Sequence, residues 1–166
     1  MIQAKHAMLF LVLLLIAALS TGYTLYNRYL SRVDNVMDHD GKSLSRYSVE
    51  IEVSGTKGSY VADLGILHIP ADGHIRVEPT LAWASRDLSI AISGRLVLSG
   101  PEYYEVEMPC MVSQNMPCIR IEVVIPGYDE PMAIKGGDYS ARVELWWRAE
   151  GAGKASIELI ILYYRG

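Results

Sequence analysis

The stretch 141–148, Ala-Arg-Val-Glu-Leu-Trp-Trp-Arg, decides the class of fold. A β-strand directs successive side chains to opposite faces of its sheet, so apolar residues repeat every second position. The apolar residues of one register here are Ala141, Val143, Leu145 and Trp147. The stretch therefore predicts a strand with one face in a core and the other in water. Trp146 falls in the register predicted to face outward.

The same alternation recurs along the chain from residue 47 onward. It is clearest at 47–53, 88–98 and 119–125, and further strands are expected at 60–69, 74–78, 80–84, 103–108 and 155–164. Clusters rich in glycine and proline separate these segments, as at 54–58 and 126–129,. Eight or nine short strands with no helical period between them predict an antiparallel β-sandwich of immunoglobulin-like type.

The last predicted strand departs from the alternation. After Glu158 both of its registers are apolar, and the outward register contains Ile160, Leu162 and Tyr164. Such a strand is covered on both sides within its own chain, or its outer face meets a partner. Trp146 raises the same question on a different strand. We therefore interpret Trp146, Ile160, Leu162 and Tyr164 as candidate interaction residues, with intramolecular cover as the alternative.

The N-terminal segment 7–26 is uncharged and largely apolar. Twenty residues of helix span about 30 Å, the thickness of a bilayer core. The segment therefore predicts a transmembrane helix, and its candidate membrane-spanning residues include Ala7, Met8, Leu13, Ala18 and Tyr26. A cleaved signal peptide is the alternative interpretation, with cleavage near Ser20.

Helical spacing of apolar residues continues past the predicted span, through Tyr29 and Val33 to about residue 36,. This stripe packs either on the chain's own β domain or on other copies of the chain. The predicted organisation is a helix at 1–36, a linker at 37–46 and a β domain at 47–166.

Two cysteines, Cys110 and Cys118, lie in a repeated Met-Pro-Cys tripeptide between predicted strands. A hairpin would bring them together, which favours a disulfide and an oxidising compartment. The alternative is a Cu(I) site, since two thiolates and the thioethers of Met108 and Met116 are soft ligands. Because of the expected disulfide and the short N-terminal tail, we expect the β domain on the extracytoplasmic side of the cell membrane.

The sequence contains no set of residues typical of catalysis. It lacks the Gly-x-Ser-x-Gly and His-Glu-x-x-His motifs, and the stretch 151–154 lacks the first glycine of a phosphate-binding loop,. The net charge is −4 and no run of Lys and Arg occurs, which argues against nucleic acid as a partner,. We therefore expect a protein that is not an enzyme and needs no cofactor.

The layout of a long hydrophobic helix followed by an all-β domain resembles archaeal type IV pilin-like proteins. It also resembles the membrane-anchored accessory subunits of the archaellum. The short leader Lys5-His6-Ala7 before Met8-Leu9-Phe10 is similar to the leader of such proteins. The resemblance implies a surface protein whose partners are the membrane and other surface proteins or copies of itself.

Three functions remain open from the sequence. The first is a membrane-anchored structural or interaction protein, acting as a filament subunit or an accessory subunit. The second is a membrane-tethered, cupredoxin-like copper or redox module that uses the Met/Cys cluster. The third is a small non-catalytic subunit of a membrane complex, because small residues in the span, such as Ala18, allow close helix packing.

Overall fold

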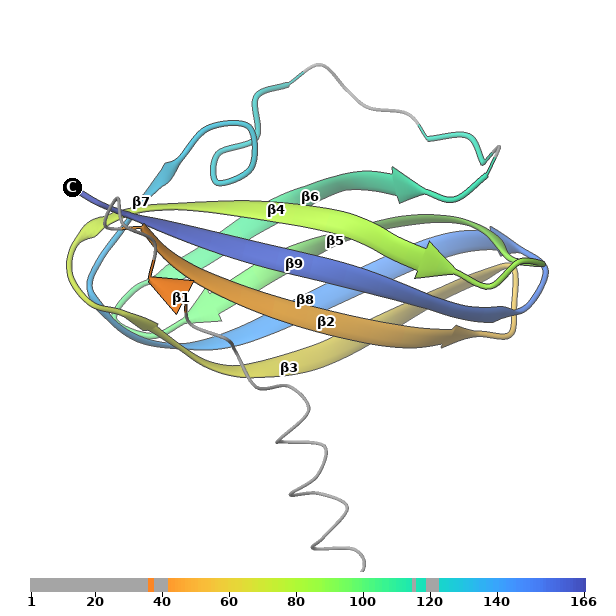
Figure 1. Cartoon of the computed structure of the whole chain (residues 1–166), viewed down its shortest axis with the longest axis horizontal. Helices are drawn as coiled ribbons and strands as arrows, with labels where there is room; N and C mark the ends of the chain where they lie inside the picture. Colours follow the sequence, from red (N-terminus) through yellow and green to blue (C-terminus); the bar gives the residue numbers. More distant parts are fainter. Residues whose placement is uncertain (1–35, 38–41, 115, 119–122) are drawn as a thin grey trace, which may run out of the picture. The chain divides into compact units, whose positions relative to one another are not determined.

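The computed structural model describes residues 36–37, 42–114, 116–118 and 123–166 (Figure 1). These residues form nine strands: β1 (Val36–Met37), β2 (Lys42–Val53), β3 (Lys57–Ile69), β4 (Gly73–Ala84), β5 (Ser89–Ser99), β6 (Tyr103–Val112), β7 (Met132–Ile134), β8 (Gly137–Glu150) and β9 (Gly153–Arg165). Within these ranges no helix is long and apolar enough to cross a membrane. The predicted span at 7–26 lies outside the described residues.

The strands form two antiparallel sheets. One has the order β1-β2-β9-β4-β7 and the other the order β3-β8-β5-β6. The pairs are nested, because β5 pairs with β6, β4 with β7, β3 with β8 and β2 with β9. The chain thus resembles a long hairpin rolled into two layers. Eight strands in this order, β2 to β9, form a jelly roll.

The prediction of an antiparallel β-sandwich is confirmed, but the strand order is not that of an immunoglobulin domain. An immunoglobulin sandwich has the sheets ABED and CFG. Here the first and last long strands are neighbours, and Lys42 pairs with Tyr164. Period-two alternation shows which face of a strand is buried but not which strand lies beside it. The topology therefore had to come from the long-range pairing.

The core lies between the two sheets and is made by the inward register of every long strand. Each of its largest members is almost completely inaccessible to solvent: Ile51, Ile69, Ile75, Leu88, Ile90, Ile92, Leu96, Leu98, Tyr139, Leu145, Ile157 and Leu159. Trp147 packs against this core, as the alternation at 141–148 predicts. The two neighbouring tryptophans therefore lie on opposite faces of β8.

Two predicted strands, 74–78 and 80–84, form the single strand β4. Pro79 does not interrupt it, and pairs with Leu159 of β9. β7 pairs with residues 73–75 only, so Pro79 lies where β4 has no second neighbouring strand among the described residues. A proline without a backbone N–H is tolerated at such an edge.

The predicted strand at 119–125 is wrong for the residues that the structure describes. Residues 123–125 are not in a strand, and residues 119–122 lie outside the description. Instead a turn closes at 125–130, where Asp129 accepts a hydrogen bond from the N–H of Ile125 at 3.0 Å. Gly127 then accepts a 2.6 Å hydrogen bond from the N–H of Val77 in β4. This loop therefore lies along β4 beyond the end of β7.

The two-sided apolar character of the last strand has an intramolecular explanation. β9 is central in its sheet, between β2 and β4 (Figure 1). Its inward residues Ile157, Leu159 and Ile161 are buried in the core. The outward residues are half-buried, because both neighbouring strands carry long side chains beside them.

Candidate interaction surface

Exposed apolar side chains gather on β3 and β8 of the four-stranded sheet. The exposed fractions on the outer face are 57% for Val61, 64% for Ile66 and 42% for Trp146. Tyr60 is 43% exposed but pairs with the buried Leu145, so its side chain lies on the opposite face of the sheet,. We call Val61, Ile66 and Trp146 the β3–β8 patch. Aromatic and aliphatic side chains left in water are enriched where proteins meet partners. The patch is therefore the first candidate for an interaction site.

Strand register explains how the patch forms. Trp146 lies opposite Ser59 of β3 and Ser93 of β5, so small residues flank its indole on both sides. Val61 lies opposite Glu144, and is thus a diagonal neighbour of Trp146. Diagonal neighbours are within reach of an aromatic side chain. The tryptophan and the valine therefore belong to one continuous surface.

A β-bulge divides β3 into two parts. The register with β8 shifts between Asp63 and Gly65. Gly65 has a φ of 85°, a backbone conformation that favours glycine, and its N–H donates a 2.8 Å hydrogen bond to the carboxylate of Asp63,. The bulge returns Ile66 to the outer face, opposite Ser140.

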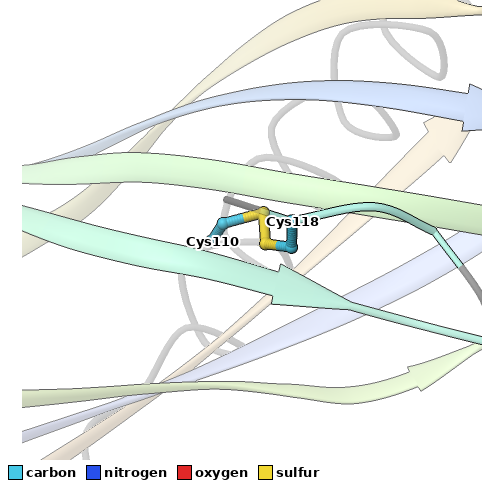
Figure 2. The surroundings of a disulfide bond; sticks show 2 residues. All are labelled: Cys110 and Cys118. Carbon is cyan, nitrogen blue, oxygen red and sulfur yellow. A yellow bond between two sulfur atoms is a disulfide. The ribbon is translucent and has the colours of Figure 1, made fainter. Parts of the chain in front are cut away.

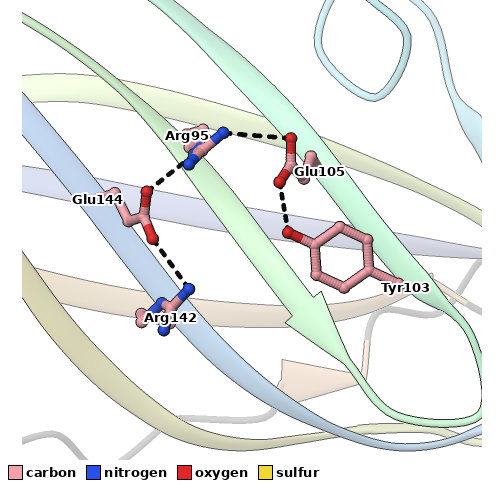
Figure 3. Close-up of polar contacts among 5 residues, drawn as sticks. All are labelled: Arg95, Tyr103, Glu105, Arg142 and Glu144. Carbon is pink, nitrogen blue, oxygen red and sulfur yellow. Dashed lines mark hydrogen bonds and ion pairs between the residues drawn. The ribbon is translucent and has the colours of Figure 1, made fainter.

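An ion-pair network borders the patch on β5, β6 and β8 (Figure 3). Arg95 donates hydrogen bonds to Glu144 at 2.8 Å and to Glu105 at 3.3 Å. Arg142 contacts the other oxygen of Glu144 at 2.9 Å. The hydrogen bond from Arg95 holds the pKa of Glu144 below its usual value of 4.5,. The carboxylate of Glu144 is therefore charged at neutral pH.

Tyr103 extends the same border at the start of β6. Its hydroxyl donates a hydrogen bond to Glu105, which raises the pKa of Tyr103 (Figure 3). Tyr103 is 61% exposed. Apolar side chains on β3 and β8 thus lie beside a polar margin, which is the usual anatomy of an interface with a polar rim.

The predicted interaction residues on β9 lie on the other outer face of the sandwich. Ile160 is flanked by Arg46 of β2 and Glu78 of β4. An ion pair of 3.0 Å joins Arg46 to Glu158, and one of 3.6 Å joins Arg76 to Glu78. The aliphatic stems of such side chains cover apolar neighbours. Around Ile160 this face is therefore more polar and less exposed than the β3–β8 patch, although Trp83 of β4, opposite Ser156, is 45% exposed on the same face.

A shallow hollow lies at the end of the same face. Its volume is about 380 Å³ and its lining residues are His74, Pro131 and Tyr164. His74 pairs with Tyr164 across β4 and β9. His68, the other histidine near this turn, instead lies on β3 and hydrogen-bonds Asp138 at 2.6 Å. The two histidines therefore belong to different sheets and form no common site.

Cys110 and Cys118 form a disulfide, as predicted (Figure 2). Their Cα atoms are 6.0 Å apart, an ordinary span for such a bond,. The predicted hairpin is not the cause, because Cys118 lies in an irregular segment. Cys110 lies instead at a bulge of β6. Gly94 of β5 pairs with Met108 and Ile92 pairs with Met111, so three steps along β6 match two steps along β5.

The disulfide bears directly on the copper alternative. Neither sulfur is a thiolate while the bond is intact, so the predicted site lacks its two strongest ligands. Met108 is buried in the core at 4% exposure, whereas Met116 is partly exposed. In the part of the chain that the structure describes, no group of three His, Cys, Asp or Glu side chains could hold a metal ion.

The structure thus separates the interaction residues predicted from sequence. Trp146 lies on the outer face of the four-stranded sheet, and Ile160, Leu162 and Tyr164 lie on that of the five-stranded sheet. Tyr29, Val33 and the predicted membrane-spanning residues lie outside the described ranges. Sequence analysis missed Val61 and Ile66. The signal was present, because 60–67 has apolar residues in both registers, as the last strand does.

Comparison with known proteins does not assign a family. No protein-family model and no curated protein matches the chain. Among solved structures it is similar to the structure of infectious bursal disease virus Gx strain, at 10% identity and a TM-score of 0.38, over 76% of this chain and 33% of that one. It is also similar to the Yersinia pseudotuberculosis-derived mitogen, at 8% identity and a TM-score of 0.30, over 74% of this chain and 87% of that one. The chain spans about a third of the length of the viral chain.

Proposed function

We propose that this chain is a membrane-tethered surface protein whose β-sandwich works by binding other proteins. In this proposal the segment 7–26 anchors the chain in the cell membrane, and the sandwich stands on the extracytoplasmic side. Its role is that of a filament subunit or an accessory subunit of a surface assembly, as the resemblance to pilin-like and archaellum proteins implies.

The observation that carries the proposal is the β3–β8 patch. Three large apolar side chains lie exposed on the outer face of one edge strand and its neighbour. Full burial of a large apolar side chain is worth about 1.5–3 kcal/mol relative to full exposure, so each of these partly exposed side chains forgoes part of that free energy. A protein partner that covers the patch recovers part of this free energy, so protein contact is the function that the surface fits best.

The disulfide supports the proposed compartment. A bond between Cys110 and Cys118 persists where the surroundings are oxidising, as outside the cytoplasmic membrane,. The tether is supported by the length and lack of charge of 7–26, which match a bilayer core,. The two observations are independent of each other.

Photo-crosslinking in intact cells tests the proposal. A photoreactive amino acid placed at Ile66 of the full chain is expected to form adducts with protein, because this side chain is the most exposed of the patch. The matched control is Thr80, which is exposed on the outer face of the five-stranded sheet. Adducts at Ile66 without adducts at Thr80 support the proposal. Absence of adducts at Ile66, or equal yields at both positions, would contradict it.

A further inference from the structure

β3 is an edge strand of the four-stranded sheet. Among the described residues its backbone pairs with β8 on one side only. An edge strand presents unpaired N–H and C=O groups to which another strand can add. Proteins usually block such edges with charged residues, prolines, bulges or covering segments. An edge that lacks such features is therefore the place where a partner strand can add.

The other described edges carry blocks along their length. β2 has β1 beside its first residues and the exposed charged residues Arg46 and Glu50 farther along. β4 has Pro79 and the neighbouring strand β7. β6 has Pro109 and the disulfide at Cys110. Each of these features interrupts or covers the backbone groups that an added strand would need.

The N-terminal part of β3 is different. The strand begins at Lys57, and regular pairing ends at the bulge that follows Asp63. Charged residues stand only at the two ends of this segment, and the five residues between them are Gly-Ser-Tyr-Val-Ala. Tyr60 is the midpoint of the segment. An uncharged, regular edge of this length is open to one more strand.

We propose that residues 57–63 of β3 pair antiparallel with the same residues of a second copy of the chain, with Tyr60 on the two-fold axis. In this register Lys57 lies opposite Asp63 of the second copy, and the reverse holds at the other end. The pairing joins the two four-stranded sheets into one continuous eight-stranded sheet. One ion pair then lies at each end of the new strand pair. The inference rests on the proposed function and names its partner.

Charge favours this register over its neighbours. Centring the pairing on Val61 places Lys57 opposite Gly65 of the second copy and leaves both charges unpaired. Centring it on Asp63 places two carboxylates directly opposite each other, which is destabilising. The register centred on Tyr60 pairs both charges and uses the whole regular segment. An isologous contact of this kind closes at two copies.

The exposed apolar side chains also fit the arrangement. Val61 lies opposite Ser59 of the second copy, on the same outer face. Ser59 itself lies opposite Trp146 within one copy. Strands two positions apart are about 10 Å apart, so the indole reaches over the small serine toward Val61 of the second copy. The pairing would thus cover two members of the β3–β8 patch, Val61 and Trp146, and would bring the two Tyr60 side chains together on the opposite face.

Cysteine crosslinking of the full chain in its membrane tests the axis. Residues directly opposite each other have Cβ atoms about 4.5–5.5 Å apart, close enough for a disulfide after small movements. Tyr60→Cys is therefore expected to give a covalent dimer of twice the chain mass on oxidation. Ile66→Cys is the matched control, because Ile66 is more exposed than Tyr60. In the proposed register, however, Ile66 of one copy lies about 40 Å from Ile66 of the second copy.

Charge reversal tests the register. Lys57→Asp is expected to lower the dimer fraction about three- to tenfold, since two exposed ion pairs become two repulsions. The swap Lys57→Asp with Asp63→Lys is expected to restore dimers, because the two ends are again complementary. A folded swap variant that fails to restore dimers would overturn the proposal. If the swap variant does not fold, the dimer yield of Tyr60→Cys relative to that of Ile66→Cys decides the question.

The outcomes separate this inference from the proposed function. No dimer from Tyr60→Cys, or equal dimer yields from both cysteine variants, overturns the self-pairing. If photo-crosslinks at Ile66 then join the chain to a different protein, the proposed function stands with another partner. If those crosslinks are absent as well, both proposals fall.

Discussion

At the scale of single residues, Tyr47 is a buried phenol whose hydroxyl has no hydrogen-bond partner among the described residues. Burial raises the pKa of Tyr47 to about 12 from 10.0,. As pH rises between these values, the phenol ionises in the unfolded chain before it ionises in the folded one. The free energy of unfolding should therefore fall with increasing pH.

Tyr47→Phe is expected to remove this alkaline loss. Relative to neutral pH, the wild type should lose about 2–3 kcal/mol more than the variant by pH 12. At neutral pH the variant should be at least as stable, because it no longer buries an unpaired hydroxyl. Denaturant unfolding as a function of pH measures both effects. Tyr60→Phe, at a half-exposed position, is the control, and an equal alkaline loss in Tyr47→Phe and wild type would contradict the account.

Gly127 is constrained by both backbone conformation and space. Its φ is 82°, and a Cβ atom there would lie 2.9 Å from Cγ2 of Val106 in the core. Gly127→Ala should therefore lower the free energy of unfolding by more than about 1–3 kcal/mol, which is the cost of the left-handed backbone conformation alone. Gly65→Ala is the matched control, because Gly65 has a φ of 85° and nothing within 4 Å of that position. Equal losses in thermal or denaturant unfolding would contradict the packing role of the 125–130 loop.

At the scale of elements, the alternation of apolar residues predicted which face of a strand is buried better than it predicted where strands begin and end. Alternation placed Trp147 toward the core and Trp146 outward, since the period of two is a property of each strand alone. It failed at 119–125, where apolar residues alternate without a strand at 123–125. It also divided β4 at Pro79, because the tolerance of a proline depends on whether a neighbouring strand needs its N–H.

The disulfide is the element-scale feature with the clearest energetic consequence. Closing a loop of about eight residues should stabilise the fold by about 2–3 kcal/mol,. The double variant Cys110→Ala/Cys118→Ala should lose that much free energy of unfolding in denaturant. Adding a reductant should lower the stability of the wild type and leave the variant unchanged. If reduced and oxidised wild type unfold at the same denaturant concentration, the bond has no stabilising role.

At the scale of the whole molecule, strand order was beyond the sequence patterns. Pairing β2 with β9 joins residues 42–53 to residues 153–164, and no local signal specifies such a neighbour. The sequence identified two interaction candidates: Trp146 as an outward-facing residue, and the last strand as apolar on both faces. Their separation onto opposite faces of the jelly roll depends on topology, and topology was not predictable.

The membrane tether makes a prediction for the full chain. Arginine near the centre of a spanning helix costs about 2.5–3.5 kcal/mol. The double variant Leu13→Arg/Ala18→Arg should therefore move the chain from the carbonate-washed membrane pellet to the soluble fraction. Arginine at Ser54, in the exposed turn between β2 and β3, should leave the chain in the pellet. A wild-type chain that is already released by carbonate would contradict the tether.

The central claim is that the β3–β8 patch mediates protein contacts, and the size of the complexes formed by the full chain in native membranes tests it most directly. The wild type should migrate in complexes larger than one chain, and Val61→Lys/Ile66→Lys should reduce them to single chains at unchanged thermal stability. Thr80→Lys, on the opposite outer face, should leave the complexes intact. Complexes of the same size in the wild type and in the Val61→Lys/Ile66→Lys variant, or single chains in the wild type, would contradict the claim.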